Sequence, residues 1–209
     1  MVKVSGPMFS LAASGSLAKT ITFATWKGRP YARELVTPAN PKSGLQTGMR
    51  SMFGFLSQYW TNVSAASQTS WDAQAEQITA SGFNAYMRFN QRLWRNFLAP
   101  TKDSGHGQVG TLATVPILAL TAGVRSIQVD FSVTIPNENW GVLIFRDLTT
   151  AFTPALSNCI KILRVETAFL SASFLDSPLV PDDYFYNAIL FTADGVLGTA
   201  VGEQTATVT

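Results

Sequence analysis

The sequence of 209 residues contains one cysteine and one histidine. With a single cysteine, Cys159, no disulfide can form within the chain, which argues against a secreted disulfide scaffold. Cys159 lies in an apolar run, so we expect a small buried residue and not a nucleophile. The histidine, His106, stands among glycines, where no preorganised partner for acid–base or metal chemistry is expected. We therefore expect no enzyme activity, no metal and no cofactor.

Charged side chains are scarce as well. They make up 13% of the sequence, whereas globular proteins usually have about 25%. A surface this poor in charge is typical of a protein that lies against other proteins. The net charge of +2 also hides an asymmetry: residues 1–100 carry ten Lys and Arg against three Asp and Glu, and residues 101–209 carry five against ten. This split indicates two units, and it would allow the positive part of one copy to meet the negative part of another.

Long apolar runs are missing too. No stretch approaches the roughly 18 apolar residues of a membrane-spanning helix. The first residues carry one lysine in an interrupted apolar patch, which is a poor match to a signal peptide. We expect the protein to be made and to stay in a cytosol.

The front of the chain predicts extended structure. Residues 19–33 alternate in apolar character around Lys27-Gly28, where a tight turn would sit, and this predicts a β-hairpin. Pro30 cannot donate a hydrogen bond to a neighbouring strand, so the second strand is expected at an edge. The segment from Thr37 to Pro41 contains two prolines and favours a stiff extended strap, because each proline biases the residue before it away from helix.

Residues 45–100 predict three helices. Apolar residues recur every three or four positions along the first, which is typical of an amphipathic helix. The second is expected to begin near Thr69 and to end before Gly82, and the third to occupy residues 83–98. The apolar stripe of the first helix consists of Leu45, Met49, Met52, Leu56, Trp60 and Val63. One tryptophan from each helix is expected in the core of a small domain: Trp60, Trp71 and Trp94.

The hydrophobic period changes to two after a polar, glycine-rich stretch that marks a linker. About seven short strands separated by turn residues follow it, and the natural arrangement for them is an antiparallel β-sandwich. The sequence therefore predicts an α+β fold in two domains. The expected parts are an arm, hairpin and strap at residues 1–44, a three-helix domain at 45–100, the linker at 101–111 and an immunoglobulin-like sandwich at 112–209.

The segment Asp-Tyr-Phe-Tyr-Asn-Ala-Ile-Leu-Phe-Thr-Ala-Asp-Gly at residues 183–195 resembles the penultimate strand and the following turn of a fibronectin type III domain. The resemblance implies an immunoglobulin-like sandwich in which a tyrosine near the start of this strand, Tyr184 or Tyr186, braces the fold. Such sandwiches are usually display or spacer modules, and the fold by itself assigns no activity.

Three arginines lie at intervals of four and three on the third expected helix. Arg88, Arg92 and Arg95 therefore share one face, and three guanidinium groups on one face suit phosphates. With Tyr86 and Trp94 nearby to stack on bases, and with a layout like a helix-turn-helix, this face is a candidate for nucleic-acid binding. The alternative is a solvated or protein-facing stripe, which the low net charge and the core spacing of the aromatic residues favour.

A second candidate surface is the stretch from Trp26 to Arg50, which combines basic and aromatic side chains with three prolines and one acidic residue. An edge strand can extend the sheet of a neighbour, and a proline strap can lie in a groove with little entropy to lose. We therefore expect this stretch to hold a neighbouring subunit. Its candidate partner-binding residues are Trp26, Lys27, Arg29, Tyr31, Arg33, Asn40, Lys42 and Arg50.

A set of short motifs also occurs in a fixed order between Ser14 and Asn90. The motifs are Gly15-Ser16-Leu17, Trp26-Lys27-Gly28, Arg33, Asn40-Pro41-Lys42-Ser43, Gln46, Arg50, Trp60, Trp71, the segment Ser81–Tyr86 and Asn90. This set resembles an N-terminal region that recurs in structural proteins of tailed phages and prophages. The resemblance implies a non-enzymatic component of a virion, made in the cytoplasm of a host bacterium, and it supplies no catalytic residues.

The same resemblance gives the functional hypotheses. It implies a capsid decoration or cement protein that docks through its N-terminal half, with a head–tail connector, collar or tail accessory protein as the alternative. The expected partners are capsid, portal or tail subunits and further copies of the chain in a symmetric assembly. Binding of nucleic acid through the arginines of the third helix is the second alternative.

Overall fold

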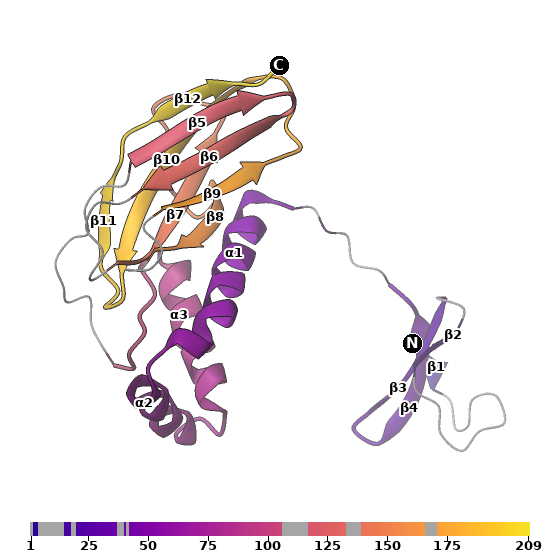
Figure 1. Ribbon diagram of the computed structural model, residues 1–209. Helices are drawn as coiled ribbons and strands as arrows, with labels where there is room; N and C mark the ends of the chain where they lie inside the picture. Colours follow the sequence, from indigo (N-terminus) through magenta and orange to yellow (C-terminus); the bar gives the residue numbers. More distant parts are fainter. Residues whose placement is uncertain are drawn as a thin grey trace. The chain divides into compact units, whose positions relative to one another are not determined.

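The computed structural model describes residues 2–3, 15–17, 20–36, 40, 42–105, 117–132, 139–165 and 171–209. The chain divides into two compact units, Met1–Pro41 and Lys42–Thr209. Over these residues, the first unit is a small sheet, and the second contains three α-helices and two further sheets (Figure 1).

The first unit is an antiparallel sheet of four strands in the order β1-β4-β3-β2. The predicted hairpin is confirmed, because β3 (Ile21–Trp26) and β4 (Arg29–Glu34) are joined by Lys27 and Gly28. Both turn residues have positive φ, 49° and 74°, as the two-residue turn that matches the twist of the strands requires. β4 is not an edge strand throughout, since β1 (Val2–Lys3) pairs with it at two residues just beyond Pro30. β2 (Gly15–Leu17) pairs with β3.

Three helices open the second unit: α1 (Gly44–Tyr59), α2 (Ala65–Glu76) and α3 (Gly82–Arg95), with a short 3₁₀ helix, η2 (Trp60–Asn62), after α1. The three predicted helices are confirmed, although α2 begins four residues before Thr69. Ser64 sets that start, because its hydroxyl accepts a hydrogen bond from the Ser67 N–H at 3.1 Å and satisfies a free donor of the first turn.

Two antiparallel sheets form the predicted sandwich, so the α+β fold class is confirmed. One sheet has the order β5-β6-β9, and the other has the order β11-β10-β7-β8, with β12 paired to the start of β10. The strands are β5 (Ile117–Gly123), β6 (Ser126–Ser132), β7 (Asn139–Asp147), β8 (Cys159–Arg164), β9 (Ser171–Asp176), β10 (Asp183–Thr192), β11 (Leu197–Ala200) and β12 (Gln204–Thr207).

The core between the two sheets follows from the alternation in the sequence. Ile127, Val129 and Phe131 of β6 are buried, whereas the residues between them are only partly covered. These three side chains belong to one hydrophobic cluster with Val142 and Ile144 of β7. A strand with a period of two thus places its apolar side chains on the inner face of the sandwich.

Tyrosines brace the sandwich at the start of β10, as the fibronectin-like segment implied. The Tyr184 hydroxyl donates to the Val180 carbonyl oxygen at 2.9 Å. The Tyr186 hydroxyl donates to Asp176 Oδ2 at 2.8 Å, and the Arg146 guanidinium pairs with the same oxygen at 2.6 Å. The second of these networks connects β10 and β7 of one sheet with the end of β9 in the other.

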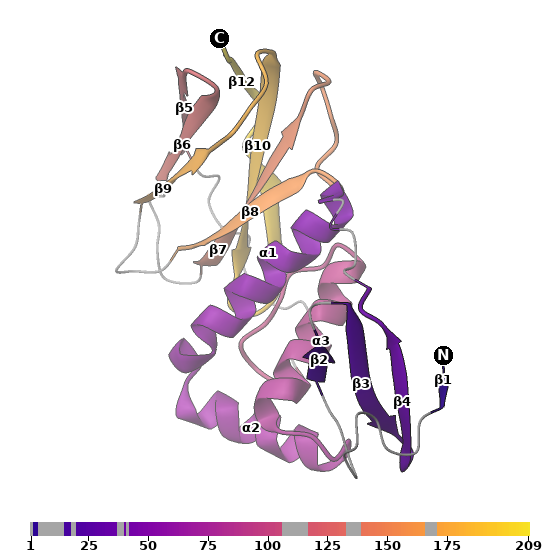
Figure 2. The same ribbon diagram turned by 90° about the vertical axis from the view of Figure 1, so that its right-hand side faces the viewer.

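β7 and β10 are apolar on both faces, and α1 packs on the face that lies outside the sandwich. Trp140, Leu143 and Phe191 of these strands are buried in one cluster with Met52 and Phe55 of α1. Figure 2 shows α1 lying along the sheet next to β8. We expected the helices to form a domain of their own, and the structure differs, because a sheet that is apolar on both faces needs a covering layer on each.

The described part of the expected linker is held in place by hydrogen bonds. The Asn90 side chain bonds the main-chain N–H and carbonyl of Thr101 at 2.8 and 3.0 Å. The carbonyl of Lys102 accepts a hydrogen bond from the Trp71 indole at 2.7 Å. This stretch therefore fastens α2 and α3 to each other, while residues 106–116, including His106, lie outside the described residues.

Candidate functional site

The N-terminal sheet gathers four of the predicted partner-binding residues on one face. Residues directly opposite each other in an antiparallel pair share a face, and Trp26 pairs with Arg29. Tyr31 and Arg33 follow at intervals of two along β4, so they lie on the same face. The Trp26 indole is 62% exposed, and Lys27 Nζ stands 4.9 Å from the centre of its ring. The result is an aromatic and strongly basic surface, which we call the basic face.

The opposite face of this sheet is mostly apolar. It carries Ile21, Phe23, Pro30 and Ala32, with Glu34 at one end. Every residue from Thr20 to Val36 is exposed or only half-buried, and Ile21 is 41% exposed. A small sheet normally needs a covered apolar face to be stable. In the described part of the first unit, none of the apolar side chains on this face is buried: Ile21 is exposed, and Phe23, Pro30 and Ala32 are half-buried.

The remaining predicted residues before α2 lie outside the sheet. Asn40 is exposed and precedes the second unit, and residues 37–39 and 41 of the predicted strap lie outside the described residues. Lys42 is exposed and has a positive φ of 48°. Arg50 is exposed on α1 and has an interaction within the chain.

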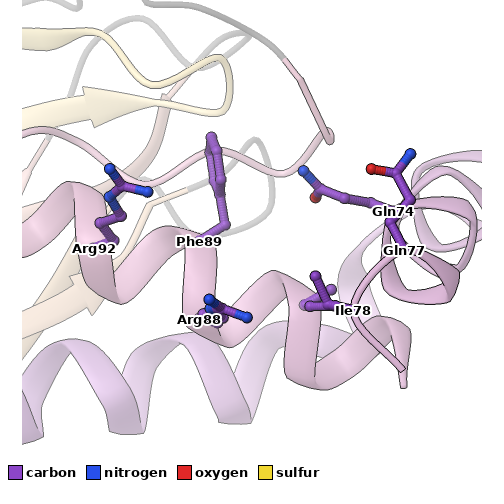
Figure 3. A pocket seen from close by; sticks show the side chains of 7 residues that line it. Gln74, Gln77, Ile78, Arg88, Phe89 and Arg92 are labelled. Atoms are coloured by element: carbon purple, nitrogen blue, oxygen red, sulfur yellow. The ribbon is translucent and has the colours of Figure 1, made fainter. Parts of the chain in front are cut away.

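Two of the three arginines on α3 line a groove. Arg88 and Arg92 lie beside a space of about 190 Å³ between α2 and α3, and Arg95 does not line it. Figure 3 shows the side chains around this space, which we call the arginine groove. Its other lining residues are Gln74, Gln77, Ile78, Ala85 and Phe89.

The polar groups of the arginine groove have few partners. Arg88 and Arg92 are exposed, and in the described part of the chain no hydrogen bond or ion pair engages either guanidinium. The side-chain oxygen of Gln74 is buried and accepts no hydrogen bond from any described residue. Phe89 and Ile78, which is 38% exposed, add apolar surface. The groove thus offers two cations and an amide beside an apolar wall.

The structure corrects one part of the nucleic-acid hypothesis. Tyr86 and Trp94 are fully buried, so neither can stack on a base. The Tyr86 ring lies 4.9 Å from the ring of Trp60, and the Trp94 indole donates a hydrogen bond to the Gly48 carbonyl. Both aromatic side chains belong to the hydrophobic core, because they lie on the buried face of α3.

Sequence reasoning missed the glutamines of the arginine groove. Gln74 and Gln77 belong to α2 and the turn after it, and no pattern in the sequence shows which face of α2 meets α3. A local signal for the start of α2 was missed as well: Ser64, whose hydroxyl caps the helix.

Groups with catalytic potential are few in the described structure. Within it, no three His, Cys, Asp or Glu side chains come together as a metal site. The Cys159 thiol is buried, and desolvation raises its pKa to about 12, which keeps it in the unreactive thiol form. In the same described ranges, no helix combines the length and the hydropathy needed to cross a membrane.

Comparisons with known proteins extend only to the fold. No protein-family model matches the sequence, and no curated protein is similar to it. A β-1,2-glucanase from Parabacteroides distasonis is similar over 51% of this chain at 14% identity and a TM-score of 0.38, and this chain covers 14% of its length.

Two smaller solved structures show the same limited likeness. The PKD domain of an M14-like peptidase from a Thermoplasmatales archaeon is similar over 48% of this chain and 98% of its own, at 14% identity and a TM-score of 0.33. A superoxide reductase (neelaredoxin) from Ignicoccus hospitalis is similar over 46% of this chain and 80% of its own, at 15% identity and a TM-score of 0.30. These similarities concern β-sandwich architecture and carry no argument about function.

Proposed function

We propose that this protein is a non-enzymatic structural component of a multi-subunit particle, and that residues 1–41 attach it to a neighbouring subunit. One observation carries the proposal: the N-terminal sheet has an apolar face on which no described side chain is buried. A partner that covers Ile21 and Phe23 would supply the missing core of this sheet, at about 1.5–3 kcal/mol for each large side chain that becomes fully buried.

The two faces of the sheet contribute differently to binding. The apolar face provides burial, and the basic face, with Arg29 and Arg33, favours a partner whose surface is acidic around the contact. The second unit needs no partner for its own stability, because it has a hydrophobic core on each side of its larger sheet. It is therefore suited to be carried on the particle through the first unit.

The kind of particle is inferred from the sequence resemblance to structural proteins of tailed phages. In such a virion the chain would be a capsid decoration or cement protein, and a connector, collar or tail accessory position is the alternative. The partners would be capsid, portal or tail subunits. A symmetric shell or ring repeats a weak contact many times, so the summed contacts hold the protein firmly.

A charge placed on the apolar face tests this proposal. We expect the full-length Phe23→Glu variant to lose co-sedimentation with purified phage particles, because the carboxylate cannot be buried against a partner without a large cost. Thr121→Glu is the matched control, since Thr121 is exposed on β5 of the sandwich, and it should be incorporated like the wild type. Quantitative mass spectrometry of the particles measures copy number, and incorporation of Phe23→Glu at wild-type copy number would refute the proposal.

A further inference from the structure

The arginine groove has the chemistry of a site for an acidic peptide. Each guanidinium presents a planar set of donors that fits a carboxylate, and Arg88 and Arg92 have no such partner among the described residues. The Gln74 side-chain oxygen can accept a hydrogen bond from a peptide N–H. Phe89 and Ile78 supply an apolar wall. A suitable occupant would therefore carry carboxylates next to an apolar side chain.

Such a segment exists at the other end of the same unit. The loop of residues 180–183, which we call the acidic tip, reads Val-Pro-Asp-Asp. Val180 is 66% exposed, and Asp182 and Asp183 are exposed. The tip leads into β10, whose first residues pair with β12 close to Thr209, and Figure 1 shows this end of the unit far from α2.

The acidic tip is held in a fixed shape. The Tyr184 hydroxyl bonds both the N–H and the carbonyl of Val180, at 3.2 and 2.9 Å. The preceding residue, Leu179, is buried, and its main chain bonds the carbonyl of Arg125 at 2.9 Å. A segment that is ordered before it binds loses little entropy on binding.

We propose that the arginine groove of one copy binds the acidic tip of a second copy. Arg88 and Arg92 would pair with Asp182 and Asp183, while Val180 would lie against the apolar wall. No described cation forms an ion pair with the tip carboxylates, the nearby Arg125 included. Asp182 Oδ1 accepts a hydrogen bond from the Asp183 N–H at 2.8 Å, and Asp183 Oδ1 accepts one from the Thr207 hydroxyl at 2.6 Å. An ionised carboxylate has further acceptor positions, so each can still accept from a guanidinium. Oppositely charged groups that are exposed and have no ion-pair partner among the described residues favour this encounter.

The position of the two surfaces fixes the kind of assembly. Groove and tip lie at opposite ends of one unit, so a single chain cannot join its own pair. The contact is heterologous, because different surfaces of the two copies meet, and each added copy leaves one groove and one tip open for the next. Such contacts produce rings or open filaments. This inference does not rest on the docking role of residues 1–41.

Charge reversal in the full-length protein tests the contact. We expect sedimentation velocity at low salt to show that the wild type associates as its concentration rises. Arg88→Glu/Arg92→Glu and Asp182→Lys/Asp183→Lys should each weaken association by more than about tenfold, because like charges would face each other. The matched control is Arg95→Glu, which changes charge on the same helix outside the groove and should associate like the wild type.

A mixture of the two variants distinguishes this contact from general loss of charge or misfolding. The first variant keeps its tip and the second keeps its groove, and the reversed groove of the first again faces opposite charges on the reversed tip of the second. An equimolar mixture should therefore restore the association that each variant alone has lost. A wild type that stays monomeric at low salt would overturn the inference, and so would a mixture that does not associate. A third result would also contradict the inference: the wild type shifts single-stranded DNA in a gel, and Arg88→Glu/Arg92→Glu abolishes this shift but leaves self-association unchanged.

Discussion

The Trp94 indole nitrogen donates a hydrogen bond to the main-chain carbonyl oxygen of Gly48 at 3.1 Å, and both residues are buried. This bond joins α3 to α1 at a position where α1 lies close to the loop before β8. A Cβ atom added to Gly48 would lie 2.5 Å from the Leu156 carbonyl oxygen. The absence of a side chain at this position therefore allows helix, loop and indole to meet.

Gly48→Ala should destabilise the second unit by about 1–3 kcal/mol, the usual cost of adding a methyl group to a packed core. The new atom would push α1 away from a main-chain oxygen, which has little freedom to move. Urea denaturation followed by far-ultraviolet circular dichroism measures the change.

Gly54→Ala is the control for this substitution. A Cβ at Gly54 meets nothing within 4 Å, and Gly54 lies in the same helix on an exposed position. Replacing it should stabilise the protein by about 0.5–1 kcal/mol, because alanine loses less backbone entropy in a helix. If both variants change stability equally, close packing at Gly48 is not the cause.

Asn90→Ala should lower the free energy of unfolding by about 1–3 kcal/mol, the cost of leaving buried polar groups without partners. Asn90 is fully buried and satisfies both main-chain groups of Thr101. The neighbouring Asn96→Ala variant is the control, because Asn96 is exposed at the end of α3. Chemical denaturation measures the free energy of unfolding of both variants. Equal values would contradict the inference that the Asn90 hydrogen bonds to Thr101 stabilise the fold.

We expect the buried Cys159 thiol to make the protein less stable at alkaline pH. Its pKa rises from 9.0 to about 12 on burial, so the folded protein keeps a proton that the unfolded chain releases. The stabilising contribution is complete below pH 9 and is lost as the pH rises toward 12. Between pH 9 and 11, the free energy of unfolding should fall less steeply in Cys159→Ala than in the wild type. Equal slopes would exclude this contribution.

The basic face of the N-terminal sheet predicts a salt-sensitive contact with a particle. Arg29→Glu/Arg33→Glu should slow attachment, since both side chains lie on this face and exposed charges act mainly on the rate of association. Attachment of the wild type should itself weaken as salt rises from low to physiological concentration. Rebinding to particles depleted of the protein, followed by sedimentation, measures both effects. Salt-independent binding of the wild type would argue that the apolar face acts alone.

Local patterns in the sequence were sufficient for most of the secondary structure. The turn at Lys27-Gly28 was predictable because few residue pairs accept two positive φ angles. The strands of the sandwich were predictable because a period of two is hard to confuse with a helix over seven residues. The predicted start of α2 near Thr69 was wrong, because the helix begins at Ala65, directly after the Ser64 side chain that caps it.

The candidate sites were predictable only in part. Trp26, Arg29, Tyr31 and Arg33 were named as candidates from their chemistry. The structure shows that they share a face, because the two-residue turn fixes the register of the two strands. The arginine groove could not be predicted, because it depends on how α2 and α3 pack together, and no local sequence pattern gives this. Trp94 shows the same limit of prediction from sequence. An aromatic residue on a helix can pack in the core or bind a ligand, and only the position of the neighbouring helix shows that Trp94 is buried.

By itself, the sequence determined the kinds of element, their order and the chemistry of each surface, because these depend on residues close together in the chain. Only the tertiary structure decided that α1 packs on the outer face of the larger sheet, and that Arg88 and Arg92 border a groove while Arg95 does not. Those outcomes depend on how apolar surfaces from distant segments bury one another. That burial is non-directional, so no short stretch of sequence specifies which surfaces will meet.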